Sequence, residues 1–77
     1  MNGRLADALL YLDKLKSENN DIFQLLSRKD LAEFAGISTE SAVKLLKAFE
    51  RDGLIILRDK DITLVNANAL NEISKRG

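Results

Sequence analysis

The chain has 77 residues, of which 45% are hydrophobic and 31% charged, and this length and composition predict one domain over residues 1–77. No apolar run approaches the roughly 20 residues that span a membrane, so we expect the domain to be soluble and cytoplasmic. Cysteine and histidine are absent, which excludes thiolate and imidazole chemistry and leads us to expect no enzyme, metal site or cofactor in this chain. The 12 basic and 12 acidic residues cancel, so nucleic-acid binding must depend on where the charges lie.

The first predicted element is a helix over residues 5–15, where leucines and alanines recur at steps of three and four. Turn-forming residues at 17–20 end it. Residues 22–26 form a short apolar run bounded by polar residues, which we interpret as a strand.

Two capped helices should follow. Ser27 and Asp30 have the spacing of a capping box, which predicts a second helix as far as about Ala35, and Gly36 then supplies a left-handed end. Ser38 is the next capping candidate, and the helical pattern resumes over residues 39–52 before Gly53 stops it.

The rest of the chain predicts a hairpin and a last helix. Residues 54–57 and 62–65 are rich in β-branched and leucine side chains and flank a charged tip at 58–61. A short helix is expected over residues 69–75, capped by Asn68. The fold class is therefore α+β, a small winged helix-turn-helix with a three-helix core, a β-hairpin wing and a short C-terminal helix.

The helix at 39–52 has two different faces. Its inner face holds apolar residues that we expect in the core: Ala42, Leu45, Leu46 and Phe49. The outer face offers Glu40, Val43 and Lys44, with Thr39 before them, and these types suit cytosine, a thymine methyl and guanine in the major groove. The alternative is a solvated face on which Glu40 and Lys44 simply pair.

Further cations and hydroxyls are candidates for contact with DNA phosphates. The backbone-contact candidates are Ser27, Arg28, Lys29, Ser38, Ser41, Lys47 and Arg51. Arg58 and Lys60 lie at the predicted wing tip, where they can reach flanking DNA. Ordinary roles remain open, because Ser27 and Ser38 also cap helices and charged tips protect hairpin edges.

The aromatic residues are assigned mainly to packing. Phe23, Phe34 and Phe49 are expected in the core. Tyr11 is interpreted as a residue at the edge of the core with its hydroxyl in water, and the alternative is that Tyr11 and Leu10 mark a docking site for another domain or subunit.

Several segments together resemble the C-terminal domain of the Crp/Fnr family of bacterial transcription regulators. The resemblance runs from Arg4-Leu5-Ala6 to the final helix, and its most telling segments are residues 26–32, 38–41 and 52–55. It implies that Glu40 and Lys44 read bases while Ser27, Arg28 and Ser38 hold the backbone. Lys44 departs from the family, which usually has arginine there, and so do Val43 and Thr39.

The resemblance also implies partners beyond this chain. It implies double-stranded DNA as the ligand, a homodimer in a full-length regulator, RNA polymerase as a further partner, and an effector ligand bound by an N-terminal domain that this sequence lacks. The chain is then a C-terminal fragment. The rival hypothesis is a winged helix that binds proteins, because that fold serves both purposes and the net charge is zero.

Overall fold

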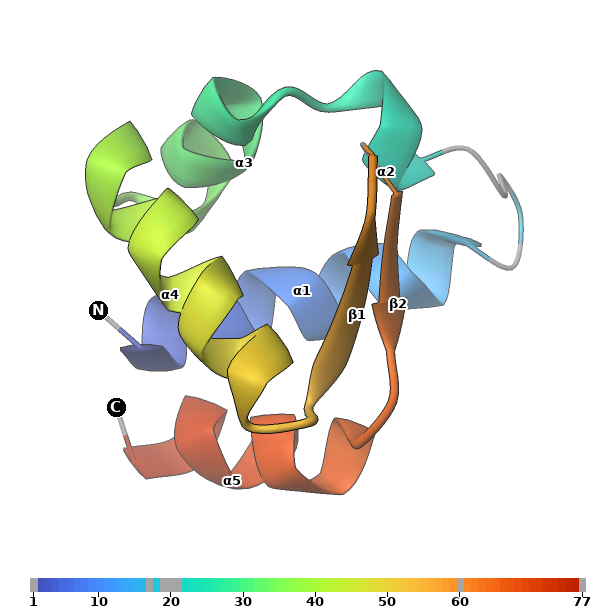
Figure 1. Cartoon of the computed structure of the whole chain (residues 1–77), viewed down its shortest axis with the longest axis vertical. Helices are drawn as coiled ribbons and strands as arrows, with labels where there is room; N and C mark the ends of the chain where they lie inside the picture. Colours follow the sequence, from blue (N-terminus) through green and yellow to red (C-terminus); the bar gives the residue numbers. More distant parts are fainter. Residues whose placement is uncertain (1, 17, 19–21, 60, 77) are drawn as a thin grey trace.

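The computed structural model describes residues 2–16, 18, 22–59 and 61–76, and within them five helices and one hairpin pack around a shared core (Figure 1). In chain order the elements are α1 (Asn2–Lys16), α2 (Ile22–Leu25), α3 (Arg28–Ala35), α4 (Thr39–Arg51), β1 (Ile55–Arg58), β2 (Asp61–Leu64) and α5 (Ala67–Arg76). This arrangement confirms the predicted α+β winged helix-turn-helix. None of the described helices has the length and apolar character needed to cross a bilayer.

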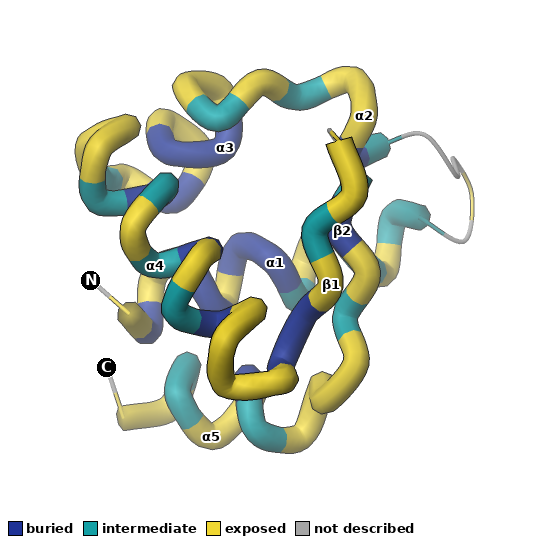
Figure 2. Tube along the Cα trace, viewed as in Figure 1, coloured by how far each residue is buried: buried dark blue, intermediate teal, exposed yellow. Residues whose placement is uncertain are grey.

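Helix α1 is the centre of the core. It contacts α2, α3, α4 and α5, and α5 lies along it (Figure 1). Its leucine stripe provides the reason, because Leu5 and Leu9 are completely buried and Leu12 is nearly so. Figure 2 shows buried segments on the inward sides of α1, α3 and α4. One apolar stripe therefore fixes the other helices, including the two of the helix-turn-helix.

The wing is a two-stranded antiparallel hairpin with one face toward the core. Its register pairs Ile55 with Leu64 and Leu57 with Ile62, and side chains alternate between the two faces of a strand. Ile55 and Ile62 are each 1% exposed. At the C-terminal end of α1, Lys16 Nζ donates to the Ile62 carbonyl at 3.3 Å. The wing is therefore attached both by its buried face and by this hydrogen bond from α1.

The strand predicted over residues 22–26 is wrong, since these residues form the single helical turn α2. Phe23 is buried, whereas Leu25 is 68% exposed, so only one side of the run reaches the core. The Leu26 amide donates to the Phe23 carbonyl at 3.3 Å and closes the turn. Periodicity cannot separate helix from strand in so short an apolar run.

The placement of Phe34 in the core is also wrong, because this side chain is 52% exposed. Leu31, Ala32 and Ala35 occupy the inward face of α3, and Phe34 lies away from it. Its ring stacks on Tyr11, with centroids 5.7 Å apart. Tyr11 is itself 52% exposed.

Two smaller predictions need correction. The last helix starts at Ala67, and Asn66 rather than Asn68 caps it, because Asn66 Oδ1 accepts a hydrogen bond from the Ala69 amide at 3.1 Å. Leu45 is half-buried and packs against the edge of the core, while Ala42, Leu46 and Phe49 are buried as predicted. Phe23 is also confirmed in the core.

Candidate nucleic-acid interface

The first helix of the helix-turn-helix begins with the predicted capping box. Ser27 Oγ accepts from the Asp30 amide at 3.1 Å, and Asp30 Oδ2 accepts from the Ser27 amide at 3.1 Å. The Ser27 backbone amide lowers the pKa of the Asp30 carboxyl below its ordinary value of 3.8, and the Ser27 side chain and the charge of Lys29 lower it further. Ser27 and Asp30 thus set where α3 begins.

Gly36 makes the turn between the two helices, as predicted. Its φ of 75° is left-handed, a conformation that L side chains rarely adopt. The Ile37 amide donates to the Ala32 carbonyl at 3.0 Å, which lets α3 end immediately before the turn. Arg4 Nη1 donates to the Gly36 carbonyl at 3.2 Å. This support for the turn comes from a residue 32 positions earlier, and no local sequence signal points to it.

Ser38 caps α4 and organises its first turn. Its Oγ accepts from the Ser41 amide at 3.1 Å and donates to Ser41 Oγ at 2.9 Å. Both hydroxyls therefore lie together at the exposed start of α4, where backbone amides point outward and favour an anion.

The outer face of α4 carries the four residues predicted to contact bases. Thr39, Glu40 and Lys44 are exposed, and Val43 is half-buried. Lys44 Nζ lies 3.2 Å from Glu40 Oε1, and the two side chains are 75% and 78% exposed. The pair that the sequence suggested is therefore present in the free chain, and both groups still face solvent.

The two cations further along α4 differ from each other. Lys47 is exposed on the same side of α4 as Lys44. Arg51 lies in the last turn, where its Nε is 3.7 Å from Asp52 Oδ1. Because both of these ionic groups are mostly exposed, the pair leaves the Arg51 guanidinium accessible to a phosphate.

Arg28 brings the start of α3 next to the wing. Its Nη2 donates to the Asp59 carbonyl at 3.4 Å, and Asp59 has a φ of 52° at the tip of the hairpin. Arg58 is exposed beside it, as is Lys29 on α3. Lys60, the other predicted wing contact, lies outside the described residues. The contact between Arg28 and Asp59 depends on tertiary folding, and the sequence pattern did not predict it.

Two acidic residues near this surface, Asp30 and Glu50, accept hydrogen bonds from backbone amides. Besides Asp30 in its capping box, Glu50 uses Oε2 to accept from the Leu57 amide at 3.1 Å, which ties α4 to β1. Sequence reasoning missed this role of Glu50. Within the described ranges, no three acidic side chains gather in a way that could hold a metal ion. The site therefore offers hydrogen-bond donors, cations and one carboxylate on the open face of α4.

Comparison with known proteins agrees with this geometry. A family model described as a Crp-like helix-turn-helix domain matches residues 3–73, from the first turn of α1 into α5. No curated protein shows a significant match to the chain.

Proposed function

The chain belongs to the family of Crp-like helix-turn-helix domains, and on that premise we propose that it binds a specific double-stranded DNA sequence as part of a bacterial transcription regulator. Helix α4 enters the major groove. The observation that carries the proposal is the pair formed by Glu40 and Lys44 on the open face of α4, because it offers one acceptor and one donor at the start of a helix whose inner face is buried in the core.

The base contacts proposed are those of Glu40 and Lys44, with Val43 and Thr39 beside them. Glu40 accepts from a cytosine amino group, and Lys44 donates to guanine. Their mutual pair must open first, which costs little, because an exposed pair of this spacing stabilises a helix by only about 0.3–0.5 kcal/mol. A good base contact gives about 1–3 kcal/mol of discrimination. Replacing the contact between Glu40 and Lys44 by contacts with bases therefore favours binding.

The phosphate contacts proposed surround this helix. Ser27 and Lys29 at the start of α3, and Ser38 and Ser41 at the start of α4, offer donors at two exposed helix N-termini. Arg28 holds the wing tip and brings Arg58 toward the flanking backbone. Lys47 and Arg51 contact phosphates beyond the bases, and Lys60 is assigned to the wing from the sequence alone.

The proposed role is binding without catalysis, and regulation comes from outside this chain. We place the effector ligand in a separate N-terminal domain and infer a homodimer for the whole regulator, so that two copies of α4 meet half-sites about one helical turn apart. RNA polymerase is the proposed further partner. This chain itself needs no cofactor in the proposal.

The test is selection of bound duplexes from a random pool, followed by affinity measurements on the enriched sequence. Lys44→Ala should weaken binding by about 1–3 kcal/mol, or roughly 5- to 150-fold, and relax the preference at one guanine. Lys44→Arg should keep that preference and tighten binding, because the guanidinium can donate two parallel hydrogen bonds to guanine.

The matched control is Lys75→Ala, which removes one exposed lysine from the last turn of α5, outside the helix-turn-helix. It should keep the enriched sequence and most of the affinity. If no sequence is enriched, the proposal fails and the protein-binding alternative takes its place. If Lys44→Ala keeps the full preference, Lys44 does not read bases.

A further inference from the structure

The turn between α3 and α4 spans residues 36–38, and its backbone groups have partners on three different helices. The amides of Gly36 and Ile37 complete the end of α3, and the Ser38 carbonyl begins α4 by accepting from an amide of its first turn. The Gly36 carbonyl instead accepts from Arg4 Nη1 of α1 at 3.2 Å. The turn is therefore tied to α1 as well as to the two helices that it joins.

Arg4 extends from a part of α1 that is packed into the core. Leu5 and Ala6, the next two residues, are completely buried, whereas Arg4 itself is exposed. A β-carbon built at Gly36 would lie 3.7 Å from Arg4 Nη1. The guanidinium therefore covers the side of Gly36 from which a side chain would project, and it contacts the turn from outside the core.

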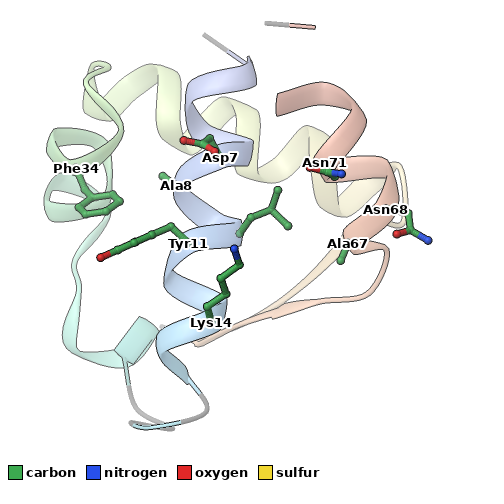
Figure 3. Close-up of a pocket in the computed structure, with 9 residues that line it drawn as sticks. Asp7, Ala8, Tyr11, Lys14, Phe34, Ala67, Asn68 and Asn71 are labelled. Atoms are coloured by element: carbon green, nitrogen blue, oxygen red, sulfur yellow. The ribbon is translucent and has the colours of Figure 1, made fainter. Parts of the chain in front are cut away.

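The same face of α1 contacts α3 two helical turns further on. Tyr11 lies seven residues after Arg4, which places both on one side of the helix, and its ring stacks on Phe34 with centroids 5.7 Å apart. Figure 3 shows these two rings side by side in a groove of about 690 Å³ between α1, α3 and α5. Phe34 precedes Gly36 by two residues, so α1 contacts the chain both just before the turn and in the turn.

The first turn of α4 has little packing of its own. Thr39 and Glu40 are exposed, and Ala42 is the first buried residue of the helix. At about 1.5 Å per residue, Lys44 lies roughly 9 Å from Ser38 along the helix axis, so a tilt of about 10° at the turn shifts it by about 1.5 Å. Hydrogen bonds from nitrogen to oxygen span only about 2.7–3.2 Å. Contacts with bases therefore require that the turn keep one position.

We propose that Arg4 is a positioning residue for DNA recognition. By donating to the Gly36 carbonyl it holds the start of α4 in the orientation that presents Glu40 and Lys44 to the bases, and it does not itself contact DNA. The inference rests on the proposed function of α4. It adds α1, which lies outside the helix-turn-helix, to the elements that determine sequence preference.

The first test replaces Arg4 by methionine, which keeps a long apolar stem and removes the donors. Circular dichroism should show a folded chain, since Arg4 is exposed. Affinity for the enriched duplex should fall about three- to tenfold, the loss expected for one hydrogen bond. Affinity for a scrambled duplex should fall by less than about twofold, because it comes from phosphate contacts of several elements. Arg4→Lys should bind the enriched duplex within about threefold of the unmodified chain, because an ammonium can donate to the same carbonyl.

Amide hydrogen exchange in the free chain tests the contact with the turn without DNA. The Ile37 amide, whose bond to the Ala32 carbonyl adjoins Gly36, should exchange about three- to tenfold faster in Arg4→Met. The Leu46 amide in the middle of α4 should change by less than about twofold. Unchanged exchange at Ile37 overturns the inference. An equal acceleration at both amides also overturns it, because that result shows a loss of overall stability only.

Arg76→Met serves as the control, since it makes the same replacement at an exposed arginine in the last turn of α5. It should leave affinity and exchange within about twofold of the unmodified chain. If Arg4 binds a phosphate directly, Arg4→Met reduces the slope of log affinity against log salt by about 0.9 and weakens both duplexes equally. That result, or full affinity in Arg4→Met, overturns the inference. If the unmodified chain enriches no duplex, the proposed function fails, and exchange at Ile37 alone decides whether Arg4 holds the turn.

Discussion

At the scale of single residues, Lys47 separates phosphate binding from base reading. It lies exposed on the outer face of α4, one turn beyond Lys44. We expect Lys47→Ala to weaken binding to the enriched duplex and to a scrambled duplex by the same factor, and to reduce the slope of log affinity against log salt by about 0.9. Anisotropy titrations at several salt concentrations measure both. A changed sequence preference would instead place Lys47 at a base.

The capping box of α3 gives a second residue-scale prediction, which concerns pH. The folded chain lowers the pKa of the Asp30 carboxyl. The stabilisation that the ionised carboxylate gives the fold is therefore complete at pH values above its unfolded pKa, and it is lost as the pH falls through its folded pKa. Ser27→Ala should cost about 1 kcal/mol of unfolding free energy and raise the Asp30 pKa only part of the way to its ordinary value, because the backbone amide of residue 27 still donates to Asp30 Oδ2. Carboxyl titration by NMR and urea unfolding at two pH values test this, and an unchanged Asp30 pKa would contradict it.

At the scale of elements, α3 and α4 each carry a phenylalanine, and the two differ in how much they contribute to the unfolding free energy. Phe49 is 3% exposed and Phe34 is 52% exposed. Phe49→Ala should therefore cost about 3–5 kcal/mol of unfolding free energy, as expected for a buried phenylalanine. Phe34→Ala should cost far less, because it loses mainly its stacking on Tyr11, worth about 0.5–1.5 kcal/mol. Urea denaturation of both variants measures the contrast, and equal losses would refute it.

At the scale of the whole molecule, the last helix belongs to the same core as the first. Leu70 of α5 is completely buried, and α5 packs along α1. Leu70→Ala should lower the unfolding free energy of the whole domain by about 2–5 kcal/mol, while Glu72→Ala, on the exposed side, should leave it nearly unchanged. Circular dichroism and Tyr11 fluorescence should report one shared transition. Separate transitions would show that α5 folds apart from the core.

The sequence by itself determined the features that local chemistry decides. Ser27 and Asp30 specify the start of α3, Gly36 specifies the turn, and Ser38 specifies the start of α4, because each acts on backbone groups within a few residues. The stripe of Ala42, Leu46 and Phe49 follows from helical periodicity alone. These signals were enough to predict the helix-turn-helix, the hairpin and the outward position of Glu40 and Lys44.

Tertiary structure decided what depends on neighbours distant in the sequence. Residues 22–25 form a helical turn in which Phe23 is buried, Ile22 packs against the core and Leu25 is exposed. Phe34 stayed exposed because smaller side chains fill the inward face of α3. Arg28 reaches the wing across 31 positions and Arg4 reaches Gly36 across 32. A local pattern shows which faces of an element are apolar or charged, but only packing determines which partner each face meets.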